Sequence, residues 1–247
     1  MKTRIIVLAA GKGKRMKQDI PKALTLLNGV PLVRYVAKAV EDSGVDPKPL
    51  FVVSSQTEPV LKEMFGSSWE YVVQHESLGT GHAVKTAHEA LQGKADTVMV
   101  FYSDQPFLRA ATIRKLQARH RKTGAMLSLA TVTVPDFSDW RESLADFGRV
   151  IRDARGTIVD IVERKDATPE ILRIREVNPS YFCFNAEWLW YNLDKLTDNN
   201  AQREYYLTDL VRIAIEGGAP IASLDISPLE SMGVNTPQQL ELARTLI

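Results

Sequence analysis

Short apolar runs alternate with helical patterns along the first half of this chain, and this alternation constrains the fold more than any other feature. The run Arg4–Ala9 is apolar and rich in β-branched residues, which is typical of a strand buried on both faces. A helical pattern over Pro31–Ser43 ends near Gly44, and the apolar run Leu50–Ser54 predicts the next strand. Such alternation predicts a parallel α/β sheet whose ligand site lies at the carboxyl ends of the strands.

The same patterns continue to about Asp136, where they change. Up to that point the further predicted elements are a helix over Glu58–Phe65, a strand over Tyr71–Gln74, a helix over Gly79–Leu91, a strand over Thr97–Tyr102, a helix over Ala110–Arg121 and a strand over Met126–Val134. Beyond it, short strands without long crossover helices predict an antiparallel lobe: Gly148–Arg152, Ile158–Glu163 and Ser180–Phe184. The last predicted elements are helices over Leu189–Lys195 and Tyr206–Glu216, a strand over Ile221–Asp225, and a helix with Thr236 as N-cap, Pro237 at its first position and Gln239 completing a capping box. We therefore expect one domain over 1–247 with two lobes, the first mainly 1–135 and 219–247 and the second mainly 136–218.

Charge and cysteine content exclude several classes of protein. The net charge of +1 creates no global field that would attract nucleic acid or an acidic membrane. The single cysteine, Cys183, rules out an internal disulfide framework and is expected to pack as a small hydrophobic side chain. No segment is long enough to span a bilayer, and the apolar run after Lys2 and Arg4 is too short for a signal peptide. These features predict a soluble cytoplasmic protein with no nucleic-acid or membrane partner, and they leave its oligomeric state unknown.

The first candidate site follows the first predicted strand, in the stretch LAAGKGKRMKQDIPKAL that begins at Leu8. Gly11 and Gly13 would let the backbone approach an anionic ligand closely, although their spacing is neither that of a P-loop nor that of a Rossmann fingerprint. Pro21 fixes the backbone before Lys22, so Lys22 is expected to contact a phosphate. The other lysines of the stretch are expected to be solvated: Lys12, Lys14 and Lys17. The alternative is a solvated turn with surface lysines.

The second candidate site is QHESLGTGHA, which starts at Gln74 after a predicted strand. Gly79 and Gly81 flank Thr80 just before a helix, where free N–H groups could meet a ligand. The amide of Gln74 could read the edge of a base. An ordinary strand–turn–helix connection is the alternative, and His82 is expected to be structural.

Asp104, in the string YSDQP, follows a buried strand, a common position for a ligand of a divalent metal. Mg²⁺ prefers one or two carboxylates together with water and substrate phosphates, and the amide oxygen of Asn235 could complete its coordination. In the alternative, Asp104 caps the next helix and Asn235 occupies a turn. Polar segments of the second lobe could bind a polyhydroxylated ligand or could be plain surface loops: FGRV, IVERKDAT, EVN and NNAQREYYLTD. No spacing in the sequence predicts a Ser–His–Asp or Cys–His set, an HExxH motif or a cysteine zinc site.

Taken in order, these strings resemble the sugar-phosphate nucleotidyltransferases, and most closely the branch that includes the uridyltransferase domain of bacterial N-acetylglucosamine-1-phosphate uridyltransferases. The matching strings are LAAGKGKRM, PKAL, LGTGHA, YSDQP, FGRV, IVERKDAT, EVN, NNAQREYYLTD and GVN, which extend from Leu8 to Asn235. The resemblance implies a Rossmann-like, mostly parallel sheet sandwiched by helices, with a smaller antiparallel sugar-binding lobe. It also implies Mg²⁺-dependent transfer of a uridylyl group from UTP to N-acetylglucosamine 1-phosphate or a related sugar 1-phosphate, which gives a UDP-sugar and pyrophosphate. No general base is required, because a phosphate is already ionised at neutral pH.

The resemblance implies a role for each matched position. The nucleotide would be held by Leu8, Ala9, Ala10, Gly11, Gln74, Gly79 and Thr80. The catalytic residues would be Arg15 and Lys22 at the phosphates, together with Asp104. The Mg²⁺ ligands would be Asp104 and Asn235. The sugar would be bound by Tyr102, Gly148, Glu163, Asn178 and Tyr205.

The sequence departs from the family pattern at three places, which are expected near the sugar. Ser103 and Arg203 stand where glycine is common, and Pro179-Ser180 replaces Thr or Ser followed by Gly. The chain ends at Ile247 without hexapeptide repeats, so we expect no acetyltransferase activity and do not carry over the trimer of longer family members. Two alternatives remain: a nucleotidyltransferase that uses another triphosphate or phosphate acceptor, and a non-catalytic regulatory subunit that binds a nucleotide sugar. The motif LGTGHA counts against the first, and the presence of Lys22 and both expected metal ligands counts against the second.

Overall fold

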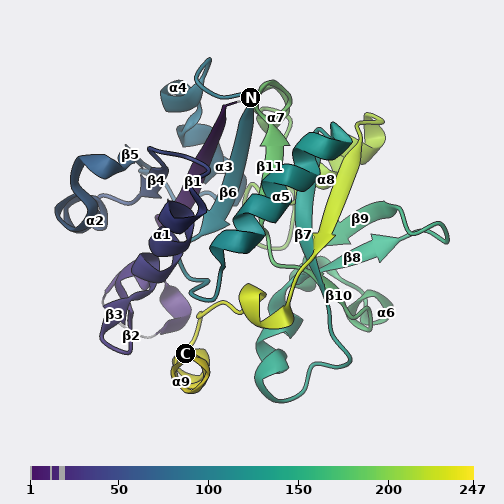
Figure 1. The fold of residues 1–247 in the computed structure, drawn as a ribbon. Helices are drawn as coiled ribbons and strands as arrows, with labels where there is room; N and C mark the ends of the chain where they lie inside the picture. The colour runs from purple at the N-terminus through teal and green to yellow at the C-terminus, as the bar shows by residue number, and fades with distance from the viewer. Residues whose placement is uncertain (1, 12, 17–19) are drawn as a thin grey trace.

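The computed structural model describes residues 2–11, 13–16 and 20–247. The expectation that Lys12 and Lys17 are solvated falls on residues outside this set, and for Lys14 the structure describes the backbone alone. Within the described residues, a ten-stranded sheet runs in the order β5-β4-β1-β6-β11-β7-β10-β8-β9, and β12 also pairs with β7 (Figure 1). The strands are β1 (Thr3–Ala9), β4 (Leu50–Val53), β5 (Glu70–Val73), β6 (Thr97–Tyr102), β7 (Leu127–Thr133), β8 (Gly148–Arg152), β9 (Ile158–Val162), β10 (Glu176–Asn178), β11 (Phe182–Asn185) and β12 (Ile221–Asp225), with a separate hairpin of β2 (Leu26–Leu27) and β3 (Val30–Pro31).

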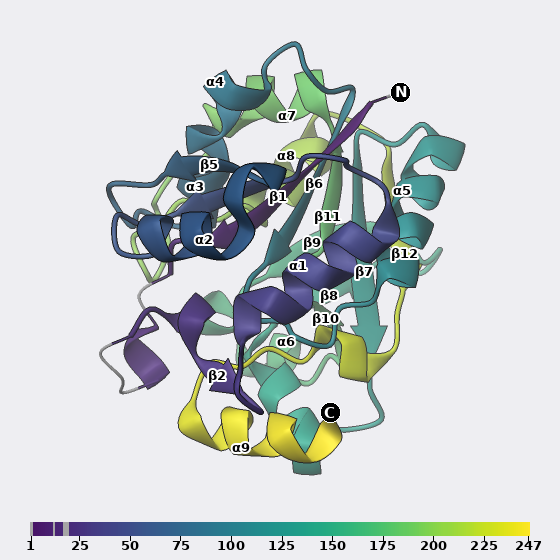
Figure 2. The ribbon, with the colours of Figure 1, turned by 60° about the vertical axis from the view of Figure 1, so that its left-hand side comes forward.

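Helices cover both faces of this sheet. The α-helices are α1 (Leu32–Ser43), α2 (Glu58–Phe65), α3 (Thr80–Thr86), α4 (His88–Leu91), α5 (Ala110–Thr123), α6 (Pro169–Leu172), α7 (Ala186–Leu193), α8 (Asp209–Glu216) and α9 (Pro237–Leu246). The 3₁₀ segments are η1 (Lys14–Met16), η2 (Lys22–Leu24), η3 (Gly66–Ser68), η4 (Asp139–Asp146), η5 (Arg164–Asp166) and η6 (Pro228–Ser231). Figure 2 shows α1 and α5 together in front of the sheet, with α7 and α8 behind it. Among the described residues, no helix is both long enough and apolar enough to cross a membrane.

The parallel half of the sheet explains the continuous apolar run of β1. Strands β5, β4, β1 and β6 are parallel, and Ile6 lies opposite Leu50 on one side and Val100 on the other. Successive side chains of a strand point to opposite faces, so Ile5 packs with α1, α2 and α5 whereas Ile6 packs with α3, α7 and α8. Burial on both faces requires the β-branched run and confirms the predicted α/β fold with its parallel sheet.

The other half of the sheet differs from the prediction in the place of one strand. The segment Ser180–Phe184 was expected in the antiparallel lobe, but β11 lies between β6 and β7 and pairs antiparallel with both. The string EVN, expected only as a polar segment, forms β10 and pairs with β7 and β8. Cys183 on β11 is fully buried, as expected, and burial raises the pKa of its thiol.

Two helix ends near the candidate site also differ from prediction. The segment Gly79–Leu91, expected as a single helix, forms two helices, α3 and α4. The Thr86 hydroxyl donates to the carbonyl of Ala83, and the Ala87 N–H donates to the carbonyl of Val84. These bonds tighten the turn between the two helices. At α9, Thr236 accepts from the Gln239 N–H at 3.2 Å, as a cap should. The Gln239 side chain, however, accepts from the N–H of Asn235 at 2.7 Å rather than from Thr236, so the cap also fixes the backbone of Asn235.

Candidate active site

Two neighbouring pockets lie at the carboxyl end of β6 and share Tyr102 and Asp104. One, of about 480 Å³, includes Gly11, Gly13 and Gly79 in its wall and is called the glycine pocket here. The other, of about 570 Å³, includes Arg15, Arg164 and Lys165 and is called the arginine pocket. Their shared wall is therefore the end of a central parallel strand, where the alternation of the sequence predicted a ligand site.

The glycine pocket brings together most of the residues predicted to hold a nucleotide. Its wall includes Leu8, Ala10, Gly11, Gln74, Gly79 and Thr80. Ala9 is the exception, because its side chain points into the core and its carbonyl accepts from the Thr57 hydroxyl at 3.3 Å. The loop after β1 and the turn before α3 thus meet as the sequence predicted.

Gly79 is held in a conformation and a space that only glycine fits. Its φ is +109°, and an added Cβ would lie 2.7 Å from the carbonyl oxygen of Tyr205. Tyr205 N–H donates to the carbonyl of Leu78, and Gly81 N–H donates to the carbonyl of Tyr205, both at 2.8 Å. The backbone of Tyr205 therefore braces the glycine turn. Its side chain lines a separate cavity of about 400 Å³ rather than either pocket.

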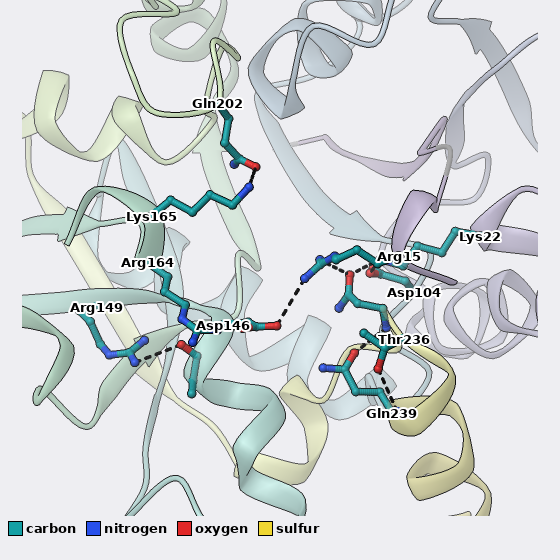
Figure 3. Close-up of polar contacts among 12 residues, drawn as sticks. Arg15, Lys22, Asp104, Asp146, Arg149, Arg164, Lys165, Gln202, Thr236 and Gln239 are labelled. Carbon is teal, nitrogen blue, oxygen red and sulfur yellow. Dashed lines mark hydrogen bonds and ion pairs between the residues drawn. The ribbon is translucent and has the colours of Figure 1, made fainter. Parts of the chain in front are cut away.

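A chain of charged and amide side chains lies between the two pockets (Figure 3). The Lys22 ammonium donates to Asp104 Oδ2 and to Asn235 Oδ1. Arg15 donates to the same Asn235 oxygen at 2.9 Å and pairs with Asp146 at 3.4 Å. Asp146 also pairs with Arg164. The structure thus brings together the four residues predicted at the phosphates and metal and adds two that were not predicted.

The oxygens of Asp104 and Asn235 converge on one cation, the ammonium of Lys22. A carboxylate oxygen and an amide oxygen are the hard donors that Mg²⁺ takes from proteins, with phosphates and water completing the shell. Within the described residues, no group of three or more His, Cys, Asp or Glu side chains could hold a metal. The donor set at Asp104 and Asn235 therefore fits a Mg²⁺ that takes its other ligands from a substrate.

The arginine pocket contains only part of the predicted sugar site. Tyr102 and Glu163 line it, and Gly148 lies close by, since an ideal Cβ there would be 3.2 Å from Cγ2 of Ile161 and in ordinary contact with Cδ of Glu163 at 3.5 Å. Asn178 lies behind the wall, where its Oδ1 accepts from the N–H of Ser180 at 2.9 Å and its buried Nδ2 has no partner. Of the five residues predicted at the sugar, the pocket wall thus includes Tyr102 and Glu163, whereas Asn178 is buried behind it.

Burial changes the ionisation of two pocket residues. It raises the pKa of Glu163, against the opposing effect of the Thr208 hydroxyl, which donates to Oε1 at 2.9 Å. Burial also raises the pKa of Tyr102, so its hydroxyl stays protonated at neutral pH and can donate a hydrogen bond.

Sequence reasoning missed several residues of the arginine pocket: Asp146, Arg164, Lys165 and Gln202. Lys165 donates to Gln202 at 2.6 Å. Three of the four lie in strings that the sequence had singled out, IVERKDAT and NNAQREYYLTD, so the signal existed. Asp146 had no such signal. The buried guanidinium of Arg149 supports the loop of Asp146, because it donates to the carbonyls of Phe147 and Ala145. Burial lowers the pKa of Arg149.

The three departures from the family pattern are placed differently from one another. Ser103, which was expected near the sugar, lines the glycine pocket between Tyr102 and Asp104, which line both pockets. Pro179 and Ser180 line the arginine pocket. Ser180 and Arg203 have positive φ values of 64° and 55°, a region that favours glycine and that other residues adopt at some cost in strain.

Comparison with known proteins places this geometry in a family. The model of the MobA-like NTP transferase domain matches residues 5–205. A relative named bifunctional protein GlmU, from Anaeromyxobacter dehalogenans (strain 2CP-C), is 42% identical over 243 residues, which are 97% of this chain and 48% of the relative. A protein of the same name from Clostridium novyi (strain NT) is 37% identical over 242 residues, which are 98% of this chain and 51% of that protein. This chain therefore spans about half the length of these relatives.

A solved structure shares the fold at much lower sequence identity. It is described as a glucose-1-phosphate thymidylyltransferase from Bacillus anthracis in complex with a sucrose. Its TM-score is 0.78 at 16% identity, and the match covers 99% of this chain and 94% of that one. At this identity the likeness establishes the fold alone.

Proposed function

The chain belongs to the family of MobA-like NTP transferase domains and is a nucleotidyltransferase, and on this premise we propose that it transfers a uridylyl group from UTP to N-acetylglucosamine 1-phosphate or a related sugar 1-phosphate. The products are a UDP-sugar and pyrophosphate. The observation that carries the proposal is the cation cluster between the pockets, where Lys22 and Arg15 meet Asp104 and Asn235. Both proposed substrates carry phosphate groups, and one substrate in each pocket would bring these phosphates together at the cluster.

We assign the nucleotide to the glycine pocket. The backbone from Leu8 to Gly11 would lie against the uridine, and the Gln74 amide and Thr80 would contact it from the α3 side, since all but Ala9 line that pocket. We assign the sugar to the arginine pocket, where Tyr102 can donate and Glu163 can accept hydrogen bonds from sugar hydroxyls. Asn178 and Gly148 would support that wall, and Tyr205 would support the glycine turn.

The reaction requires positioning and charge neutralisation rather than proton transfer. A phosphate oxygen of the sugar 1-phosphate attacks the α-phosphorus of UTP, and the bond to pyrophosphate breaks. Lys22 and Arg15 would orient the phosphates and neutralise their charge. Asp104 and Asn235 would hold Mg²⁺, which supplies further charge neutralisation at the phosphates when bound.

Each of the two lobes expected from the sequence would then bind one of the two substrates. The nucleotide lobe is mainly 1–135 and 219–247, and the sugar lobe is mainly 136–218. We also propose that the enzyme acts in the cytoplasm, which is supported by its one cysteine being buried.

The test is pyrophosphate release with Mg²⁺, measured over a grid of nucleoside triphosphates and sugar 1-phosphates. We expect release with UTP and N-acetylglucosamine 1-phosphate. Release only with another triphosphate or another acceptor would refute the assigned substrates, and no release with any pair would support a binding subunit. Asp104→Asn is expected to reduce turnover by about a hundredfold or more, because charge stabilisation by a catalytic metal is worth several kcal/mol. The matched control is Asp42→Asn, which changes an exposed carboxylate paired with Lys38.

A further inference from the structure

His82 contacts Gln74 from behind the wall of the glycine pocket. Gln74 follows β5, is only 7% exposed, and lines that pocket. His82 lies on α3 and lines the separate cavity of about 400 Å³ instead. The two side chains meet at 2.9 Å, between Gln74 Nε2 and His82 Nδ1. His82 can therefore act on a ligand of the glycine pocket only through Gln74.

The neighbours of the Gln74 amide fix which way it points. Its Nε2 lies 3.4 Å from the carbonyl oxygen of Gly79, in hydrogen-bond geometry. A carbonyl oxygen can only accept, so the amide group facing it must be the NH₂. The same NH₂ faces His82 Nδ1, so Nδ1 must be the accepting, unprotonated nitrogen of the ring. The proton of the neutral imidazole is then on Nε2.

This orientation leaves an acceptor on the pocket side. With its NH₂ used by His82 and Gly79, Gln74 keeps its Oε1 for a ligand, and within the described residues this oxygen accepts no hydrogen bond. Uracil carries a donor, N3–H, on the edge that such an oxygen would read. Cytosine carries an acceptor at N3, so two acceptors would face each other with no hydrogen bond between them.

We propose that His82 is a positioning residue that locks the Gln74 amide and thereby makes the glycine pocket select uracil over cytosine. The inference rests on the proposed function, which places a nucleotide base in that pocket. Without an acceptor at position 82, only the longer 3.4 Å hydrogen bond to the Gly79 carbonyl still holds the amide, so rotation by 180°, which presents its NH₂ to the N3 of cytosine, costs much less. Thymine has the same N3–H as uracil, so the lock discriminates against cytosine and not against thymine.

The test compares UTP with CTP in variants of His82. His82→Leu removes the acceptor and is expected to lower the ratio of kcat/KM for UTP to that for CTP by about tenfold or more, the usual cost of losing a fixed hydrogen bond in a buried site. His82→Asn places an amide oxygen where Nδ1 lies and is expected to restore the ratio. His88→Leu is the matched control, since His88 stacks on Trp190 with ring centroids 4.8 Å apart and lines neither pocket.

The outcomes separate this proposal from the proposed function. If the wild type shows no turnover or binding with UTP, the proposed function fails. If the wild type prefers UTP and a folded His82→Leu variant keeps the same ratio, the lock is refuted and the proposed function stands. Calorimetric binding of UTP and CTP without sugar gives the same ratio independently of chemistry.

A direct measurement covers the case in which His82→Leu does not fold. The ¹⁵N chemical shifts of the His82 ring in the wild type at neutral pH report which nitrogen carries the proton. A protonated Nε2 with an accepting Nδ1 is the expected result. A proton on Nδ1 would overturn the proposal, because Nδ1 could then not accept from Gln74.

Discussion

Replacing Lys22 with methionine should strengthen metal binding while it slows the reaction. Lys22 holds the two oxygens, on Asp104 and Asn235, that we assign to Mg²⁺. In the ligand-free protein the ammonium therefore competes with a divalent cation for the same donors. Methionine keeps most of the side-chain length and apolar volume, so Lys22→Met removes the competing charge with little change in packing.

The size of the effect follows from the contact that is lost. A hydrogen bond to a charged group contributes about 1.5–3 kcal/mol net, which corresponds to roughly 10- to 150-fold in affinity. The Lys22 and Asp104 side chains are 17% and 15% exposed, so solvent weakens the pair only in part. We expect metal affinity to rise by about tenfold, the lower end of that range, because a displaced lysine recovers some hydration. Turnover should nevertheless fall strongly, since Lys22 can no longer contact the phosphates.

The assay measures Mn²⁺ binding without nucleotide, from the loss of the free-ion signal in electron paramagnetic resonance. Pyrophosphate release is measured on the same samples. Lys38→Met is the matched control, because Lys38 is exposed and pairs with Asp42 on α1. Unchanged or weaker Mn²⁺ binding in Lys22→Met would refute the reasoning that Lys22 occupies the metal position, and unchanged turnover would refute its proposed contact with the phosphates.

Two further predictions separate function from stability. Gly11→Ala adds a Cβ that meets no protein atom within 4 Å, so its free energy of unfolding should change by less than about 0.5 kcal/mol while UTP binding weakens, as chemical denaturation and calorimetry would measure. An equal affinity for UTP would move the nucleotide away from the loop after β1. Burial raises the pKa of Glu163, so its stabilising contribution is fully present below the unfolded pKa, about 4.3, and is lost as pH rises through the higher folded pKa. Glu163→Gln cannot titrate and should lose less thermal stability than the wild type between pH 4 and pH 7.5, and an equal loss in both proteins would contradict the raised pKa.

Local patterns were sufficient for the limits of several strands. The strands over Thr97–Tyr102, Gly148–Arg152 and Ile221–Asp225 begin and end where the sequence predicted. Thr97–Tyr102 is a nearly fully buried apolar run that is followed by polar residues, so burial sets its limits, whereas the other two strands are only partly buried. The position of Asp104 at such a strand end was therefore predictable, whereas its partner Asn235, 131 positions further along the chain, was assigned to the metal from the family resemblance.

Local patterns did not predict which strands and loops lie beside one another. The sequence marked a strand near Phe182, but nothing in its apolar pattern says that it inserts between β6 and β7 rather than joining the antiparallel lobe. Asp146 lies in a polar loop whose place depends on Arg149, a buried arginine held by backbone carbonyls. From sequence alone, an arginine that follows a glycine would be predicted at the surface. The loop that contains Asp146, and its carboxylate, could therefore not be assigned to the site in advance.

The cations between the pockets are all held by acceptors that a phosphate can replace. Arg15 and Arg164 share Asp146, but their side chains are 61% and 52% exposed, and such pairs contribute little stability. An incoming phosphate offers each guanidinium two parallel charge-assisted hydrogen bonds, which are stronger than the single contact that each makes with Asp146. Lys22 is far less exposed, at 17%, and is bound to two oxygens. The exposed arginines should therefore exchange a carboxylate for a phosphate first. Lys22 should follow only when a second cation takes over Asp104 and Asn235, and the tightening of Mn²⁺ binding in Lys22→Met tests whether a cation competes with Lys22 for these two side chains.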